Sequence, residues 1–337
     1  MNGLQAVAVG VALGIITSLG LIVVYPPSDA YLLQNPYWDG MSTLRHDFSL
    51  TGISNLLYLS QLVPSASHDA LLIIGPSLPY TKEEAAAISG FVRAGGLVVV
   101  ADDFGTGNQL LALMNMSSRF NGNLLIDPLY NIKAGPLPLI TQVNIPGVHT
   151  LAFNYATYLN VTDPDSTILA WSSPFSFADL YHTGSYIQGD PLGPFPVVAS
   201  IHVGRGRVIL ISDSSLYLNS MITEADNYAS FASIVGGRQP FIDTSHWVYS
   251  GTTQAKQLLV YAYDAASTLD LKYALVLAAG LLVAIIKVGT SSTSAPPEND
   301  AQKLSRLHPD WNLSELQRLA KERSSISSAS NGAATSE

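Results

Sequence analysis

Two apolar runs on either side of an amphipathic segment constrain this chain more than any other feature. The run ALLIIG (70–75) and the run LVVVA (97–101) are typical of strands buried on both faces of a sheet. Between them, Thr81 and Glu84 have the spacing of a capping box at a helix start, and a glycine pair ends the helix. Parallel strands need such a crossover helix, so residues 70–101 predict a β-α-β unit.

A second pair of apolar runs predicts a β-hairpin near the end of the same domain. PVVASIHV and RVILIS are joined by the glycine-rich turn 204–206, which is a hairpin signal, and Asp213 ends the second run much as Asp102 ends the earlier one. Between the two units, residues 120–195 are rich in Pro, Gly, Asn and aromatics and predict an irregular insertion with short strands at NLLID and STILAWS. Residues 26–250 therefore predict a single α/β domain, a mostly parallel sheet flanked by helices.

The two ends of the chain predict transmembrane helices at 1–25 and 269–288. The first contains a run of 21 residues without a charge, long enough to cross a bilayer. The second has a shorter apolar core, 273–286, which Lys272 and Lys287 can extend by snorkelling. A cleaved signal peptide is the alternative for the first segment and a core helix for the second.

The distribution of basic residues predicts the orientation of the chain. Six Lys and Arg residues follow the apolar core 273–286 of the second predicted span, whereas the connection after the first span has none until Arg45. Both termini are therefore expected in the cytoplasm of a two-pass cell-membrane protein, with the 26–250 domain outside. Residues 251–268 predict a juxtamembrane helix, and residues 289–337 a cytoplasmic linker followed by a short amphipathic helix.

Charge and cysteine content exclude several functions. The segment 26–268 holds nine Lys and Arg against eighteen Asp and Glu, and an acidic domain without a basic stripe argues against nucleic acid as a partner. The chain has no cysteine, which excludes a disulfide framework, a thiolate metal site and a cysteine nucleophile. No cofactor motif is found.

Several stretches together resemble the archaeal and bacterial DUF4350 family: NPYWDGMS (35–42), the segment 71–111, and parts of 204–231 and 241–247. The resemblance implies an outer domain similar to class I glutamine amidotransferases, with a flavodoxin-like sheet, and to the accessory domains of gliding-motility-type ABC systems. It also implies a partnership with a MoxR-type ATPase or a transporter-like system.

An amidotransferase-type elbow requires a nucleophile, a histidine and an acid. At the corresponding strand end the sequence reads Ala101-Asp102-Asp103-Phe104, so cysteine chemistry is absent. A serine replacement remains an alternative, because Ser212, Ser214 and Ser215 flank Asp213 and His246 could approach them in the fold, although no G-x-S-x-G motif occurs.

Polar residues near the predicted strand ends should meet at one rim of the sheet, where ligands of open α/β proteins bind. Backbone amides of the glycine turn could hold a phosphate and the carboxylates a hard cation, but neither a phosphate-loop motif nor a local metal-ligand spacing is present. A structural turn is the simpler interpretation, with glycines permitting its backbone angles and an aspartate capping the next helix. The candidate ligand-binding rim comprises Asp102, Asp103, Gly105, Gly107, Asn108, Asp213 and His246.

The expected function is that of a non-catalytic, membrane-anchored accessory or binding protein, without catalytic residues or a metal site. We expect a protein partner to bind through the outer domain or the cytoplasmic tail. One alternative is a hydrolase or metal-dependent enzyme acting on cell-envelope material, with the aspartates at the rim. A structural component of the envelope is the other.

Overall fold

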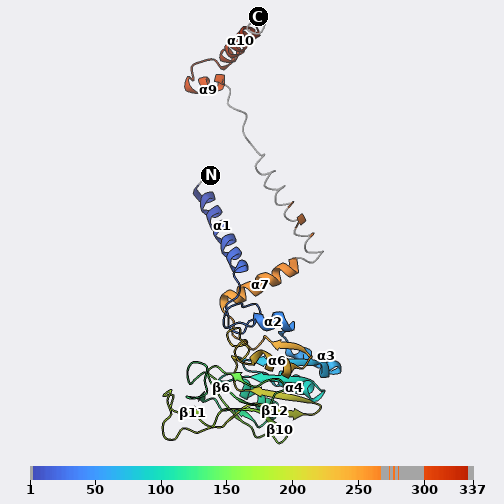
Figure 1. The fold of residues 1–337 in the computed structure, drawn as a ribbon. Helices are drawn as coiled ribbons and strands as arrows, with labels where there is room; N and C mark the ends of the chain where they lie inside the picture. Colours follow the sequence, from blue (N-terminus) through green and yellow to red (C-terminus); the bar gives the residue numbers. More distant parts are fainter. Residues whose placement is uncertain (1–2, 267–272, 274–275, 278–279, 281–299, 333–337) are drawn as a thin grey trace. The chain divides into compact units, whose positions relative to one another are not determined.

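The structure is a computed structural model that describes residues 3–266, 273, 276–277, 280 and 300–332. The chain divides into two compact units, 1–260 and 261–337. The first unit contains an eight-stranded sheet with helices on both of its faces (Figure 1).

The sheet has five parallel strands followed by three that continue it in antiparallel pairs. The α/β class and the mostly parallel sheet are therefore confirmed. In order across the sheet the strands are β1 (Thr51–Ile53), β14 (Gln239–Asp243), β2 (Asp69–Ile74), β3 (Leu97–Ala101), β13 (Gly206–Ile211), β12 (Pro196–Val203), β10 (Ser166–Trp171) and β7 (Gln142–Val143).

The predicted β-α-β unit is present. β2 and β3 pair in parallel, with Ala70 opposite Leu97, and α4 (Lys82–Arg93) connects them. Both bonds of the capping box form, since the Thr81 side chain accepts from the amide of Glu84 and the Glu84 carboxylate accepts from the amide of Thr81. The predicted hairpin joins β12 to β13 in antiparallel register.

Two hydrophobic clusters fill the space between the sheet and its helices. On one face, Leu71 and Val98 pack with α4, α3 (Leu59–Leu62) and α5 (Gly107–Leu113). On the other face, Leu72 and Val99 pack with α2 (Ser42–Phe48) and α6 (Asn227–Val235). Two 3₁₀ helices, η1 (Leu56–Tyr58) and η2 (Val63–His68), lead into β2.

The insertion at 120–195, between the β-α-β unit and the β12–β13 hairpin, is irregular, as predicted, but it also extends the main sheet. β10 and β7 come from it and cover the edge of β12 that would otherwise expose unpaired backbone groups. The remaining strands form two-stranded pairs: β4 (Arg119–Phe120) with β9 (Leu159–Asn160), β5 (Leu124–Ile126) with β11 (Phe177–Asp179), and β6 (Leu139–Ile140) with β8 (Leu151–Ala152).

The terminal helices are α1 (Gly3–Val24), α7 (Gly251–Ala266), α9 (Asp300–Leu307) and α10 (Leu313–Gly332). α1 coincides with the first predicted span, whereas most of the second, 269–288, lies outside the described residues. In the described part of the chain, no helix combines the length and apolar character needed to cross a membrane, so the two spans are not confirmed. In the tail, α9 begins inside the segment predicted as linker, and α10 is 20 residues long, not short.

Candidate functional site

The predicted rim residues lie at the carboxyl ends of neighbouring parallel strands. Asp102 and Asp103 follow β3, Asp213 follows β13, and His246 follows β14. The sheet order places β2 between β14 and β3. The prediction that these residues share one edge is therefore correct, but they form two separate groups there.

Asp102 organises the turn from β3 into α5. One carboxylate oxygen accepts the amide hydrogens of Asp103 and Gly105, both at 2.9 Å, and the other accepts that of Gly107 at 2.7 Å. The hydroxyl of Thr106, the residue before the helix, makes no capping bond and donates to the Leu78 carbonyl instead. Asp102 thus satisfies an amide at the helix start from five residues upstream.

The two glycines of this turn are required for space and not for unusual backbone angles, which corrects the sequence-based explanation. Neither Gly105 nor Gly107 has a positive φ. A Cβ at Gly105 would lie 2.2 Å from the Pro76 carbonyl oxygen, and one at Gly107 would lie 2.6 Å from the Asp102 carboxylate. The chain passes so close to the carboxylate that only hydrogen fits.

Asn108 is occupied in a structural contact. Its amide nitrogen donates to the carbonyl of Phe120 at 2.8 Å, and its oxygen accepts the Phe120 amide at 2.9 Å. The side chain thus fastens α5 to β4 in the manner of a strand partner. No polar atom of Asn108 is directed at a ligand by this arrangement.

Asp103 begins a short chain of polar contacts. The Ser214 hydroxyl donates to its carboxylate at 2.9 Å, and the Tyr31 hydroxyl lies 2.8 Å from the same serine oxygen. The Tyr31 ring stacks on Trp247, with centroids 6.1 Å apart. Burial raises the pKa of Tyr31 to about 12, so the phenol at the end of this series of contacts does not act as an acid near neutral pH.

Asp213 is fully buried and joins the insertion to the main sheet. Its carboxylate accepts the amides of Asn154 and Ser215, each at 2.7 Å. Burial raises the pKa of this carboxyl well above its ordinary value, and the charge of Asp103 raises it further. For Asp102, burial raises the pKa to about 6 despite the amide bond from Gly107.

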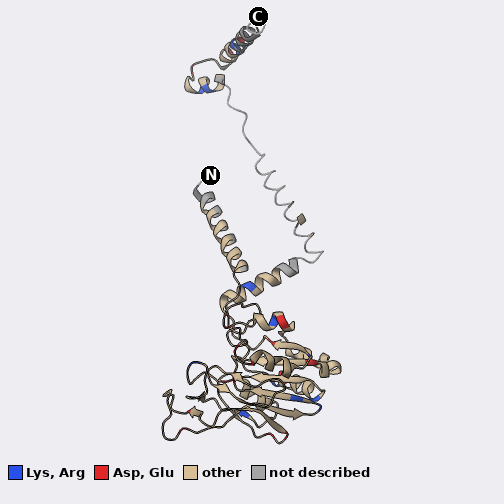
Figure 2. Ribbon diagram, viewed as in Figure 1, with Lys and Arg blue, Asp and Glu red and all other residues tan. Residues whose placement is uncertain are grey.

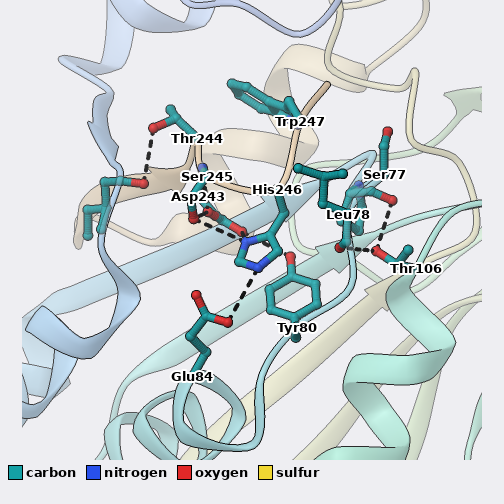
Figure 3. A network of polar contacts seen from close by, with 12 residues as sticks. Ser77, Leu78, Tyr80, Glu84, Thr106, Asp243, Thr244, Ser245, His246 and Trp247 are labelled. Atoms are coloured by element: carbon teal, nitrogen blue, oxygen red, sulfur yellow. Dashed lines mark hydrogen bonds and ion pairs between the residues drawn. The ribbon is translucent and has the colours of Figure 1, made fainter. Parts of the chain in front are cut away.

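His246 lies in the second group, between two carboxylates (Figure 3). Its Nδ1 is 2.7 Å from Asp243 and its Nε2 is 3.6 Å from Glu84. The imidazole stacks on the Tyr80 ring at 3.7 Å, and the Tyr80 hydroxyl donates to Asp243 at 2.9 Å. Ser245 completes the group by donating to the same carboxylate.

The charges of this second group stabilise one another. Burial alone would lower the pKa of His246, but the hydrogen bond and charge of Asp243, with the charge of Glu84, raise it. Burial would raise the pKa of Asp243, yet its bonds from His246 and Ser245 hold it below the ordinary value. The group is a histidine held between the carboxylates of Asp243 and Glu84 and stacked on Tyr80.

The loop between β2 and α4 separates the two groups and binds to both. The amide of Ser77 donates to the His246 carbonyl at 2.7 Å, while the carbonyl of Pro76 accepts the amide of Thr106 at 2.9 Å. Gln109 of α5 exchanges two bonds with the Tyr80 backbone, at 2.9 and 2.8 Å. Loop and rim therefore form one rigid layer over the strand ends.

A serine nucleophile needs the histidine within hydrogen-bond reach. Ser214 contacts Asp103 and Tyr31 and is not paired with His246. The Ser245 hydroxyl lies 3.1 Å from His246 Nδ1, but it donates to Asp243 at 2.6 Å, and both ring nitrogens are directed at carboxylates. Across the residues that the structure describes, no three His, Cys, Asp or Glu side chains are arranged to hold a metal ion.

Sequence reasoning missed the partners of His246. Asp243 is three residues before it, a spacing that could have indicated the pair, whereas Glu84 was assigned to the capping box alone. Tyr80 and Tyr31 carry no local signal, since they reach Asp243 and Ser214 from 163 and 183 residues away.

Among the comparisons with known proteins, a family match covers most of the domain. The model of a family described as "Domain of unknown function (DUF4350)" matches residues 34–235. No curated protein matches the sequence. Among solved structures, the mmIFT52 N-terminal domain is 15% identical, with a TM-score of 0.44, over 58% of this chain and 88% of that one.

Two further solved structures are similar at lower scores. A ThuA-like protein from Bacteroides uniformis is 14% identical, with a TM-score of 0.32, over 54% of this chain and 75% of that one. The cytoplasmic protein STM1381 from Salmonella typhimurium LT2 is 12% identical, with a TM-score of 0.31, over 55% and 79%.

Proposed function

The chain belongs to the DUF4350 family, and from that membership we propose that its α/β domain is a non-catalytic binding domain of an accessory protein. One observation carries the proposal: the polar groups of the rim are used to hold the fold. Asp102 accepts three backbone amides, Asp213 accepts two, and His246 is held between two carboxylates. A catalytic group must instead be free to exchange a proton or form a bond with substrate.

In this proposal the partner binds through the insertion. Several of its large apolar side chains are exposed, and Tyr130 stacks on Phe175 with ring centroids 6.1 Å apart. Aromatic side chains supply large contact areas at a small entropic cost and are enriched at protein interfaces. We define the insertion surface as Leu129, Tyr130, Phe175, Tyr181 and Tyr186.

Membrane attachment is a further part of the proposal. Its support is the uncharged run of 21 residues near the amino terminus and the basic residues after the second apolar segment. On this basis the domain is extracytoplasmic and the 289–337 tail is cytoplasmic. The proposed class of partner rests on the family resemblance: a transporter-like system would bind the insertion surface outside, whereas a MoxR-type ATPase, which uses cytoplasmic ATP, would bind the 289–337 tail.

A matched pair of phenylalanine variants tests the insertion surface. Phe175 and Phe104 are exposed to similar extents, 54% and 57%, but Phe104 belongs to the rim turn. The intact protein in mild detergent is used as bait, and co-purifying proteins are identified with and without residues 288–337. Phe175→Ser should abolish capture of the partner, whereas Phe104→Ser should leave it unchanged. The reverse result would move binding to the rim.

The competing function is hydrolysis, and one observation favours it: the contact chain Asp103–Ser214–Tyr31 lies at the edge where α/β enzymes act. Ser214 is only 2% exposed, however, so substrate cannot reach its hydroxyl in this conformation. A hydrolytic activity of the purified protein that disappears with Asp103→Asn would replace the binding proposal.

A further inference from the structure

A pocket lined by basic residues lies at the amino ends of the parallel strands, which form the edge of the sheet opposite to the rim. Its volume is about 400 Å³. Figure 2 shows blue residues at this end of the sheet, on the side where α3 and α4 are labelled in Figure 1. We call it the arginine pocket, and it is lined by His202, Arg205, Gly206, Arg207 and Arg238.

Three separate elements build the arginine pocket. Arg207 is the second residue of β13 and lies opposite His202 of β12. Arg238 precedes β14, immediately after the turn at Gly236 and Gly237, which have φ angles of 59° and 77°. The two arginines are thus brought together across the starts of β2 and β3.

The pocket has no acidic lining residue, although the chain has a net charge of −9. Asp69, at the start of β2, accepts a bond from Ser65 of η2. In a strand, successive side chains alternate between faces, so Asp69 lies on the face opposite to Ala70. Ala70 belongs to the cluster shared with Ile209, whose face also carries Arg207. The carboxylate of Asp69 therefore lies on the face of the sheet opposite to Arg207 and does not face the pocket.

Arg207 and Arg238 are half-buried, and one donor of each guanidinium group has no partner among the residues described. The Nε atoms of Arg207 and Arg238 are buried, and within the described part of the chain neither has a hydrogen-bond partner. No ion pair of that part includes either residue. Burial lowers the pKa of Arg207, and the neighbouring charge of Arg238 lowers it further. Buried donors and charges without partners are costly and uncommon in folded proteins.

The carboxyl end of α6 offers an incomplete explanation for these charges. α6 ends at Val235, and cations are favoured near the end of a helix dipole. That attraction accounts for a cation in the connection after the helix, but it satisfies no donor directly. Among the described residues, no guanidinium of the pocket donates to an α6 carbonyl.

We propose that the arginine pocket binds a phosphoryl group, a role distinct from partner binding at the insertion surface. The planar fork of arginine matches phosphate oxygens, and each arginine has five donors to satisfy. A phosphate carries up to two negative charges and several acceptor oxygens, which suits a pocket with three arginines better than a single carboxylate. The volume of the pocket also leaves room for the organic part of a phosphate ester.

The test measures binding of inorganic phosphate to the full chain in detergent, by calorimetry and by the shift of the thermal midpoint. Phosphate should raise the midpoint of the wild type, because a ligand that binds only the folded state stabilises it. Arg207→Gln combined with Arg238→Gln should weaken phosphate binding at least about tenfold. Arg45→Gln, which removes an exposed arginine from α2, should bind phosphate as the wild type does.

One further variant and two further ligands complete the test. Arg238→Gln alone lies in a connection and supplies the measurement if the double variant does not fold. Absence of a phosphate shift in the wild type, or an equal shift in the arginine variants, would overturn the proposal. Equal shifts with glycerol 3-phosphate and dihexanoyl phosphatidic acid would assign a soluble ester. A larger shift with the phosphatidic acid would assign a lipid headgroup.

Discussion

At the carboxyl edge of the sheet Asp102 accepts three backbone amides, whereas at the amino edge the Nε atoms of Arg207 and Arg238 have no partner in the described structure. Both edges place charged side chains among buried atoms, but only at the carboxyl edge do backbone amides bind them. Helices that follow parallel strands begin at the carboxyl edge, so their unpaired amides are available to carboxylates there. A buried polar group that has a partner within the fold is therefore structural, and one that has none is a candidate for binding, wherever it lies on the sheet.

The largest loss of stability is expected from His246→Ala. The substitution leaves Asp243 and Glu84 close together without their shared cation, and removing one member of a buried charged group costs about 3 kcal/mol or more. The free energy of unfolding measured with denaturant should fall by that amount. His46→Ala, at a histidine side chain that is 89% exposed, is the control and should change little. A small effect at His246 would mean that the group does not hold the carboxyl edge together.

Gly107→Val should destabilise the chain by about 2 to 3 kcal/mol. The added side chain would begin 2.6 Å from the Asp102 carboxylate, and either the turn or the cap must move. Gly90→Ala, within α4 and with nothing inside 4 Å, should instead add about 0.5 to 1 kcal/mol. Thermal unfolding of the two variants compares them directly, and equal midpoints would contradict the close-approach explanation.

The stability of the fold should decrease as pH rises from 4.5 to 7.5. The pKa of Asp102 is raised from 3.8 to about 6, so its contribution is complete below pH 3.8 and is lost as pH rises through about 6. Between pH 4.5 and 7.5 the free energy of unfolding should fall by ~2 kcal/mol through this group. The raised pKa of His246 acts in the same direction, while the lowered pKa of Asp243 matters only below pH 3.8. Denaturant unfolding that shows increasing stability over this range would contradict the assigned shifts.

Arg207→Gln should leave the free energy of unfolding unchanged or raise it by about 1 kcal/mol in phosphate-free buffer. The substitution removes a half-buried charge that lies near Arg238 and has no ion pair within the described part of the chain. The expected change in the free energy of unfolding is opposite in sign to that of His246→Ala, and this difference distinguishes the two edges of the sheet most directly. A loss above 2 kcal/mol would show that Arg207 is a structural residue.

Asp103→Asn should have the smallest effect, about 0.5 kcal/mol. The new amide can donate to the Ser214 hydroxyl, which then donates to Tyr31. The donor released is the Tyr31 hydroxyl, on a side chain that is partly exposed to water. The variant should also capture the same partner as the wild type in the pull-down. Loss of partner capture at unchanged stability would place the binding surface at the rim.

Much of the fold was determined by the sequence through interactions between neighbouring residues. The apolar runs of β2 and β3, the capping box at Thr81 and Glu84, and the hairpin before β13 depend on propensities and bonds within a few residues. The shared edge of Asp102, Asp213 and His246 followed as well, since parallel strands align their ends. Even the cap of Asp102 on the α5 turn is a contact over five residues.

Only the tertiary structure decided which charges meet. Tyr80 reaches Asp243 across 163 residues, and Glu84 serves both a local cap and a distant histidine. The space available at Gly107 depends on where the Asp102 carboxylate lies. Arg207 of β13 and Arg238, which precedes β14, are brought to one pocket although β2 and β3 lie between their strands. Such pairs depend on how the sheet is ordered and which face each side chain occupies, and no interaction between neighbouring residues specifies either.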